Sequence, residues 1–274
     1  MTIITKIMGG LGNQMFQYAC AKALACRLGA KLQLDKSWFA EGNRVFQLDA
    51  FPAIRVYNAW KPNILQRIKL CKIRYTKESK ISYWSEILNI KSSVHLRGYW
   101  QNEKYFSDIS SIIKQDFSFP DFLCAEAENI AKKIKSSPCS VSIHVRRGDY
   151  LENIDYHGLC SPEYYEKALE IIADKSKERL DLFLFSDDPQ WVKDNFDSRG
   201  NSVVIVDIEQ HKDAPYHDMH LMSLCKHHII ANSSFSWWGA WLSTENGTVI
   251  APKCWFAEET IRQHNPATET WIKI

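Results

Sequence analysis

The sequence lacks the features that mark several large classes of protein. None of its apolar runs approaches the ~20 residues that a membrane-spanning helix needs. The opening residues, MTIITKIMGG, hold neither a long apolar core nor a small-residue cleavage site, so we expect no signal peptide and a cytoplasmic location. A net charge of only +2 is too small for a dedicated nucleic-acid binder. We therefore expect a soluble protein with no nucleic-acid partner.

Cysteine pairs and repeats are also missing. The eight cysteines form no CxxC pair, which argues against a zinc site or a redox motif and favours reduced, mostly buried thiols. No internal repeat or low-complexity tract is present. Two Asn-x-Ser/Thr sequons occur at Asn232 and Asn246, and we expect neither to carry a glycan in a protein that is not secreted.

What is present is an alternation of short apolar strands and helices, which predicts an α/β protein with parallel sheets. Near the start we expect a strand at 3–8, a glycine turn at 9–12, a helix at 13–28 and a strand at 31–34. A second series has expected strands at 140–145, 181–185, 203–206, 228–231 and 248–251. A Ser-Ser-Pro break at 136–138 separates the two series. The sequence therefore predicts two α/β halves, 1–137 and 138–274.

Polar residues gather where the strands of the second half end. His144 and Arg146 alternate with buried positions and share one face at the end of their strand. Ser186 and Asp187 end the next strand, and the segment 232–236 ends a third. Ligands of open parallel sheets bind outside the carboxyl ends of the strands. We therefore expect a binding site at this edge.

The residue types at this edge suit a nucleoside diphosphate. The guanidinium groups of Arg146 and Arg147 match phosphate oxygens, and Asp149 is placed to orient one of them. Asp187 could accept hydrogen bonds from guanine. The plainer alternative is that the Arg and Asp side chains form a surface salt bridge.

Two serines precede an expected helix, WWGAWLS, in the same half. The hydroxyls of Ser234 and Ser236, with the free N–H groups of the helix start, could cradle a phosphate. The plainer alternative is that Ser236 caps the helix.

The N-terminal turn GGLGN has part of a dinucleotide fingerprint. Met15 stands where a third small residue is wanted, which argues against a dehydrogenase. The alternative is that the turn, with Gly10, presents Asn13 and backbone N–H groups to a pyrophosphate or a sugar.

A metal cofactor is not expected. The sequence has no Asp-x-Asp pair, the usual cation ligand of many enzymes that use nucleotide sugars, and the nearest approach is Asp207 with Glu209. We predict no metal site and no cofactor.

Four segments together resemble the α-1,2-fucosyltransferase family. They are GGLGNQMFQYA (9–19), HVRRGDY (144–150), FSDD (185–188) and NSSFSWWGAWL (232–242), in the order usual for that family. The resemblance implies a GT-B-like fold of two Rossmann-like halves facing a cleft. It also implies an acceptor-binding half at 1–137, a GDP-fucose-binding half at 138–274, and an inverting reaction without metal.

The resemblance assigns roles to particular residues. Arg146 would hold the β-phosphate, while His144 and Asp187 would hold guanine. Further donor contacts would come from Gly10, Asp149, Ser186, Ser234, Phe235 and Ser236. Asn13 would lie near the reaction centre. The general base is left open between Glu152 and Asp155, with His157 behind them.

The expected reaction moves fucose from GDP-fucose to the 2-hydroxyl of a terminal β-galactose in an oligosaccharide or lipid-linked glycan. One alternative is a non-catalytic nucleotide-sugar or glycan-binding module, whose tryptophans, such as Trp237, Trp238 and Trp241, stack on sugars. Another is a fucosyltransferase of a different linkage. The basic segment 61–80 is either a solvated face or a peripheral contact with the inner face of the cell membrane. The sequence predicts no oligomeric state.

Overall fold

The computed structural model describes residues 1–40, 44–54, 74–78 and 82–274. The chain divides into two units, Met1–Pro120 and Asp121–Ile274. This division lies before the predicted break at 136–138. The reason is that α4 (Ala125–Ser136) buries its apolar face against Phe183 and Leu221 of the second unit. Most of the basic segment 61–80 lies outside the described residues.

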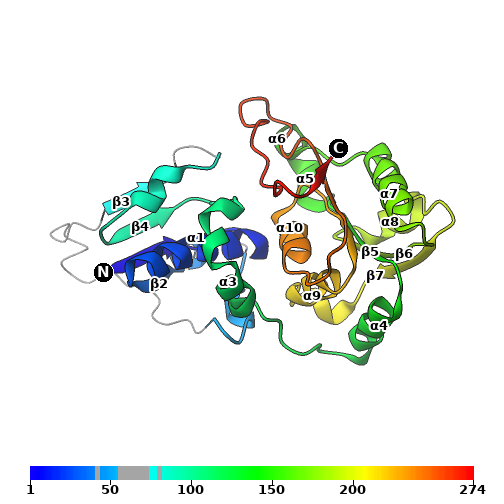
Figure 1. Ribbon diagram of the computed structural model, residues 1–274, viewed down its shortest axis with the longest axis horizontal. Coiled ribbons are helices and arrows are strands. Elements are labelled where there is room, and N and C mark those ends of the chain that lie inside the picture. Colours follow the sequence, from blue (N-terminus) through cyan, green and yellow to red (C-terminus); the bar gives the residue numbers. More distant parts are fainter. Residues whose placement is uncertain (41–43, 55–73, 79–81) are drawn as a thin grey trace. The chain divides into compact units, whose positions relative to one another are not determined.

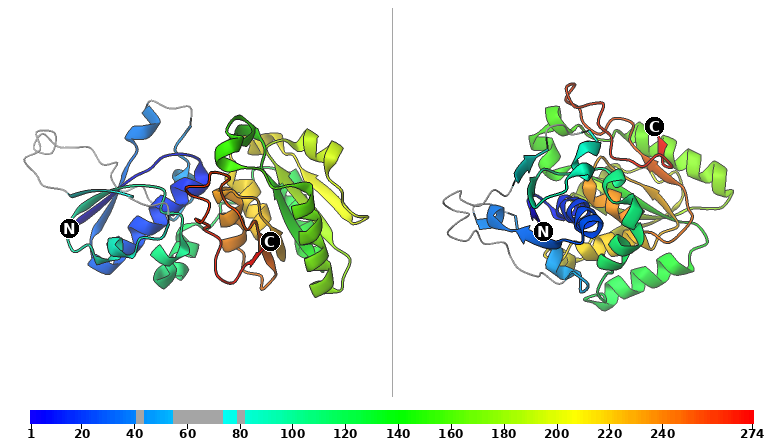
Figure 2. Two further views of the ribbon diagram at one scale, coloured as in Figure 1. Left: turned by 90° about the horizontal axis from the view of Figure 1, so that it is seen from above. Right: turned by 60° about the vertical axis from the view of Figure 1, so that its left-hand side comes forward.

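The first unit is built on a parallel sheet of four strands. Their order is β2-β1-β4-β3, with β1 (Thr2–Lys6), β2 (Lys31–Asp35), β3 (Arg74–Lys77) and β4 (Val94–Arg97). The helix α1 (Leu11–Leu28) packs along β1 and β2, and Figure 2 shows it in blue beside them. The first two strands and this helix were predicted, whereas β3 and β4 were not. Short helical turns complete the unit: η1 (Ser37–Ala40), η2 (Leu48–Ala50), η3 (Ser85–Asn89), η4 (Glu103–Tyr105), η5 (Ser107–Ile109) and α3 (Ser110–Asp116).

Glycine sets both ends of α1. Gly29 has a φ of +57°, in the left-handed region, and its N–H donates to the carbonyls of the last helical turn. Gly10 precedes the first helical residue, and Gly9 turns the chain with a φ of +78°. The helix therefore begins at Leu11, two residues before the predicted start.

The second unit is built on six parallel strands in the order β10-β9-β8-β5-β6-β7. They are β5 (Ser140–Val145), β6 (Asp181–Ser186), β7 (Ser202–Val206), β8 (His227–Ile229), β9 (Val249–Ala251) and β10 (Ile272–Lys273). Five of these were predicted, and the two-residue β10 was not.

Helices cover both faces of this sheet. Val141, Ile143 and Val145 of β5 face α7 (Pro162–Ser176) and α8 (Pro189–Asn195). The opposite face, which carries Phe183 and Phe185, packs on α4 and α9 (Tyr216–Ser223). Figure 1 shows the sheet with α7 and α8 on one side and α9 on the other. The remaining elements are α5 (Gly148–Glu152), α6 (Ile154–His157), η6 (Glu209–His211) and α10 (Ser234–Trp241).

Among the described strands, the order of each sheet reverses at one point. After β1 the chain adds β2 on one side and β4 on the other, and after β5 it adds β6 on one side and β8 on the other. In doubly wound sheets, ligands bind at the carboxyl ends of the two strands that flank such a reversal. The fold therefore points to the ends of β1 and β4 in the first unit, and of β5 and β8 in the second.

The tryptophans of α10 are packed in the interior. Trp237 and Trp238 are fully buried and Trp241 is nearly so, and their rings contact one another. They cannot stack on a sugar, so this part of the glycan-binding alternative is wrong. None of the described helices combines the length and the apolarity that crossing a membrane requires. The seven described cysteines are free thiols, and Cys71 lies outside the described residues.

The second unit buries several histidines, which makes its stability depend on pH. The ring of His228 is fully buried, and its Nδ1 hydrogen-bonds to the hydroxyl of Ser142 at 2.8 Å. Burial, and then the charge of His227, lower the pKa of His228 to about 3, from about 6.5 in an unfolded chain. Burial is also the largest cause that lowers the pKa values of His144, His217, His220 and His264.

Between about pH 4 and 6.5 the unfolded chain binds protons on these histidines, and the folded chain does not. We therefore expect the free energy of unfolding to fall as the pH is lowered from about 6.5. Urea unfolding at pH 7 and pH 5 measures the slope. His228→Asn, which keeps a polar group near Ser142, should make it shallower. If His228→Asn had the same slope as the native protein, His228 would not contribute to the pH dependence, and its pKa in the folded protein would be close to normal.

Candidate functional site

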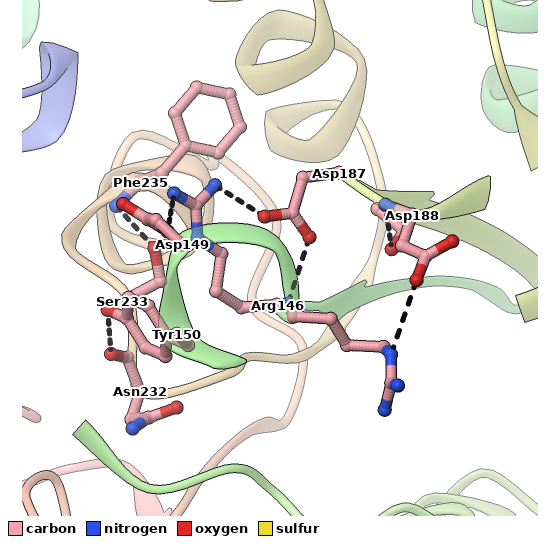
Figure 3. A network of polar contacts seen from close by, with 10 residues as sticks. Arg146, Asp149, Tyr150, Asp187, Asp188, Asn232, Ser233 and Phe235 are labelled. Carbon is pink, nitrogen blue, oxygen red and sulfur yellow. Dashed lines mark hydrogen bonds and ion pairs between the residues drawn. The ribbon is translucent and has the colours of Figure 1, made fainter. Parts of the chain in front are cut away.

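Arg146 follows β5 directly and is held by two carboxylates. Its Nη2 lies 2.5 Å from Asp149 Oδ1, and its Nη1 lies 3.1 Å from Asp187 Oδ2. Figure 3 shows the guanidinium between these two aspartates. The guanidinium carbon also lies 5.4 Å from the ring centre of Tyr150. The predicted role of Asp149 in orienting an arginine thus matches the geometry, and the orientation of Arg146 is fixed from three sides.

Asp187, from the end of β6, also shapes the loop after β5. Its Oδ1 accepts a hydrogen bond from the backbone N–H of Arg147 at 2.9 Å. A Cβ at Gly148 would lie 2.5 Å from Asp187 Oδ2, so a larger residue could not occupy this position without a shift. Both oxygens of Asp187 are therefore used within the protein. The prediction that this carboxylate contacts guanine stays a prediction.

Arg147 points to different partners from Arg146. Its Nε lies 3.4 Å from Asp188 Oδ2, and its guanidinium carbon lies 3.9 Å from the ring centre of Trp191. Asp188 in turn caps α8, accepting from the N–H of Trp191 at 3.1 Å, and donates its own N–H to Ser186 Oγ at 3.0 Å. Arg147 and Ser186 thus anchor the β5 and β6 loops, and Arg146 is left as the arginine at the carboxyl end of β5.

His144 lies in β5, two residues before Arg146, and is buried. Its ring centre lies 5.8 Å from that of Phe235, the second residue of α10. Burial, and then the charge of Arg146, lower the pKa of His144 to about 3, so its ring is neutral at physiological pH. Within the described part of the chain, its buried Nδ1 has no hydrogen-bond partner. His144 and Phe235, two predicted donor contacts, are thus neighbours.

The start of α10 differs in detail from the prediction. The helix begins at Ser234, so Ser234 and Ser236 lie within it, and Ser233, not Ser236, is its cap. The Ser233 hydroxyl accepts from the N–H of Phe235 at 3.3 Å. Ser236 is buried, and its hydroxyl donates to the carbonyls of Ala231 and Ser233. The Ser236 hydroxyl is therefore used within its own chain segment, and its contact with a phosphate stays a prediction. Ser234 is half-buried at the first helical position, where N–H groups are free of helical partners.

Tyr150 and Asn232 connect the segment after β5 to the segment after β8. The sequence did not predict this link. The Tyr150 hydroxyl donates to the carbonyl of Asn232 at 2.9 Å (Figure 3). The Asn232 Nδ2 donates to the carbonyls of His157 at 2.8 Å and Trp255 at 3.1 Å. Both residues belong to the two long motifs quoted above, at positions that carry no charge. A tyrosine that ends HVRRGDY was the signal that could have found this link.

The candidate general bases are not separated by the geometry. Glu152 ends α5 and Asp155 lies in α6, and both are exposed. The ring of His157 stacks on that of Tyr150 at 4.1 Å, and burial lowers its pKa. The ranking of these three residues stays a prediction.

In the first unit, the glycine turn presents Asn13 at the end of β1. The Gln101 Nε2, just beyond β4, donates to Asn13 Oδ1 at 2.6 Å. Gly10 has no side chain to fill the space before α1, where a Cβ would lie 3.9 Å from Arg44 Nη1. Asn13 therefore lies at the point where the strand order of the first sheet reverses.

Two buried glutamines hold this turn, and the sequence reading missed their role. The Gln17 side chain accepts from the N–H of Met8 at 2.9 Å and donates to the carbonyl of the same residue. The Gln14 Nε2 donates to the carbonyls of Gly9 and Val45, and its Oε1 accepts from the N–H of Gln47. The signal that could have revealed them is a pair of glutamines three residues apart among the mostly apolar residues of this helix.

No group of three or more His, Cys, Asp or Glu side chains within the described ranges is arranged to hold a metal ion. Asp207 pairs with Lys193, and Glu209 pairs with Lys212. The prediction that the protein needs no metal stays a prediction.

The second-unit site combines an oriented guanidinium with a helix start. The Arg146 Nε is buried and has no hydrogen-bond partner among the described residues. The N-terminus of α10, which carries a partial positive charge, lies beside His144. This helix follows β8, the strand that pairs with β5. Such an arrangement can hold an anion such as a diphosphate and stabilise negative charge that develops on it.

The link through Asn232 predicts a large effect of one added charge. Asn232→Asp turns a donor that faces two carbonyls into a buried carboxylate, and we expect the free energy of unfolding to fall by at least about 2 kcal/mol. Asn246→Asp, the same change at an exposed residue, is the control. Urea unfolding measures both variants. Equal stabilities would mean that the Asn232 side chain is not held as described.

Comparison with known proteins identifies the family of this chain. A family model described as glycosyl transferase family 11 matches residues 94–274. The alpha-1,2-colitosyltransferase of Escherichia coli is 35% identical, over 99% of this chain and 98% of that protein. The O-antigen biosynthesis glycosyltransferase WbnK of Escherichia coli is 33% identical, over 98% and 99%. Galactoside alpha-(1,2)-fucosyltransferase 1 of Rattus norvegicus is 24% identical, over 89% of this chain and 64% of its own length.

The solved structures agree on the fold. Fucosyltransferase NodZ from Bradyrhizobium superposes with a TM-score of 0.54 at 16% identity, over 88% of this chain and 92% of NodZ. That likeness shows the fold alone, which is GT-B-like, as the resemblance implied. From the matching family model and the two full-length relatives above 30% identity, we conclude that this chain is a glycosyltransferase that belongs to glycosyl transferase family 11.

Proposed function

We propose that the protein transfers fucose from GDP-fucose to the 2-hydroxyl of a terminal β-galactose, with inversion at the anomeric carbon and without a metal. The family and the relatives named for α-1,2 transfer support this choice. The acceptor would be an oligosaccharide or a lipid-linked glycan. A cytoplasmic location, peripheral to the membrane where the acceptor is lipid-linked, fits a relative named for O-antigen biosynthesis.

The observation that carries the proposal is the position of Arg146. Its guanidinium lies at the strand reversal of the second sheet, and two carboxylates hold it there. In a displacement at the anomeric carbon, negative charge grows on the departing diphosphate. A guanidinium that is already oriented stabilises this charge without having to reorganise during the reaction. The start of α10 adds free N–H groups on the same edge.

The bond changes of the proposed reaction are these. The 2-hydroxyl oxygen of the acceptor forms a bond to the anomeric carbon as the bond from that carbon to the GDP oxygen breaks. The hydroxyl proton passes to a base, for which Glu152 and Asp155 are equal candidates and His157 is the third. GDP leaves with both electrons of the broken bond, held by Arg146.

A second donor is favoured by one relative. The colitosyltransferase is 35% identical to this chain over nearly its full length. Colitose differs from fucose by the loss of one hydroxyl group, so the same diphosphate site would serve both nucleotide sugars. The specificity would then lie in the sugar pocket. Transfer of fucose to a different hydroxyl, and binding of nucleotide sugars without catalysis, are the rival functions that the experiment must separate.

A donor panel tests the function. The native protein is incubated with a β-galactoside and with GDP-fucose, GDP-colitose, GDP-mannose or UDP-galactose in turn, in the presence of EDTA. We expect released GDP and an α-1,2-linked product with GDP-fucose, and little or none with GDP-mannose or UDP-galactose. A preference for GDP-colitose would replace fucose as the donor. Binding of GDP without release of sugar from any donor would support the non-catalytic module.

The role of Arg146 gives a separate prediction. Arg146→Ala removes an oriented donor to the leaving group, and we expect turnover to fall at least ~100-fold while the protein stays folded. Arg146→Lys should restore little, because an ammonium cannot replace the guanidinium between two carboxylates. Arg179→Ala, at an exposed arginine, is the control. Circular dichroism checks the fold, and near-normal turnover of Arg146→Ala would contradict the assignment.

A further inference from the structure

The turn that follows β4 in the first unit has an unusual backbone. Trp100 adopts a φ of +53°, a left-handed conformation that a bulky residue rarely takes. Gly98 lies so close to Glu78 that a Cβ there would be 2.4 Å from the Glu78 Cβ. A strained turn of this kind persists when its surroundings fix it firmly, and such turns gather at functional sites.

Glu78, just beyond β3, fixes the turn with its carboxylate. Its Oε2 accepts from the N–H of Tyr99 at 2.7 Å, and its Oε1 accepts from the N–H of Trp100 at 3.1 Å. Burial raises the pKa of Glu78 to about 7, against the effect of these two donors. Desolvating a carboxylate is costly. Glu78 therefore secures the turn at some expense in stability.

The Trp100 side chain secures the turn from the other side. Its indole is fully buried, stacked on Trp84 with ring centres 6.4 Å apart and edge-on to Tyr105 at 5.8 Å. The N–H of Asn102 donates to the Trp100 carbonyl at 2.8 Å. Gln101, between Trp100 and Asn102, is thus held by fixed neighbours on both sides.

Gln101 makes one side-chain contact that reaches another strand connection. Its Nε2 donates to Asn13 Oδ1 at 2.6 Å. The Asn13 Nδ2 then lies over Gly9, where a Cβ would come within 2.9 Å of it. Asn13 is half-buried, and within the described part of the chain the contact with Gln101 is the hydrogen bond that its side chain makes. The contact therefore determines which end of the Asn13 amide is left for a ligand.

We propose that Gln101 is a positioning residue that orients the Asn13 amide, so that the first unit offers an N–H donor of fixed direction to an oxygen atom of the sugar substrates. Glu78 keeps Gln101 in place through the turn. This inference rests on the proposed transferase function and deepens it. The ligand atom it selects is a hydrogen-bond acceptor, such as a hydroxyl, ring or glycosidic oxygen, and not a cation.

Three variants test the inference through the kinetics of transfer. Gln101→Ala removes the contact. Gln101→Glu keeps the shape of the side chain but can only accept, so the Asn13 amide must turn and present its oxygen instead. Asn13→Ala removes the amide itself. Gln115→Ala, the same substitution as Gln101→Ala at an exposed position of the same unit, is the control.

We expect kcat/KM to fall about 10-fold in Gln101→Ala, the loss that one net hydrogen bond of about 1.4 kcal/mol corresponds to. Gln101→Glu should lose at least as much, although it is nearly isosteric. The double variant Asn13→Ala with Gln101→Ala should match Asn13→Ala alone within about 2-fold, because Gln101 acts through Asn13. Thermal unfolding of Gln101→Glu should stay close to that of Gln115→Ala.

The outcomes separate this inference from the proposed function. A native protein that transfers no sugar from any donor contradicts the proposed function, and the positioning role falls with it. Normal transfer by the native protein, with Gln101→Ala and Gln101→Glu unaffected, contradicts the positioning role alone. Losses that multiply in the double variant would also overturn it, since Gln101 would then act independently of Asn13. If the fall in kcat/KM only matched the fall in the fraction of folded protein, Gln101 would have a purely structural role, which also contradicts the inference.

Discussion

The second unit depends on how one positive charge is held. Arg146 lies between Asp149, from the helix α5 that follows it, and Asp187, which comes directly after the neighbouring strand β6. A partly buried guanidinium is stable when carboxylates face it, and the same carboxylates restrict its orientation. Gly148 makes this possible, because its lack of a side chain lets Asp187 approach the loop. The loop, the following helix and the adjacent strand end are all shaped around this group of three charges.

The two units hold the polar residues at their strand reversals with different chemical groups. In each, the first strand lies beside the point where strand order reverses, and a glycine lies shortly after its end, Gly9 after β1 and Gly148 after β5. The second unit fixes its polar residues there with ion pairs. The first unit uses the neutral amides of Gln14, Gln17 and Gln101, and the carboxylate of Glu78 accepts there from backbone N–H groups and not from a cation. Charged groups suit a phosphate, whereas amides with defined donors and acceptors suit the hydroxyl groups of a sugar.

The sequence was sufficient to predict the α/β class, the strands that alternate cleanly with helices, and the strand ends that carry Arg146 and Asp187. It was insufficient where contacts join distant segments. β3 and β4 have only four residues each, too few for periodicity to reveal them. Nor does local pattern reveal that Ser236 turns inward, that Arg147 stacks on Trp191, or that Gln101 meets Asn13 across 88 positions. These facts depend on tertiary packing, which spacing in one sequence does not encode.

The burial of Asn232 has a consequence for how the protein is produced. Its side-chain amide donates to the His157 and Trp255 carbonyls, so the folded chain offers no free amide to a glycosylating enzyme. A secretory host attaches glycans to sequons while the chain is still unfolded. A glycan on Asn232 would then block the connection between α6 and the end of β8 before it forms, whereas one on the exposed Asn246 would meet no such obstacle. The protein should therefore be expressed in a compartment without glycosylation, where the Asn232 amide stays free to form these hydrogen bonds.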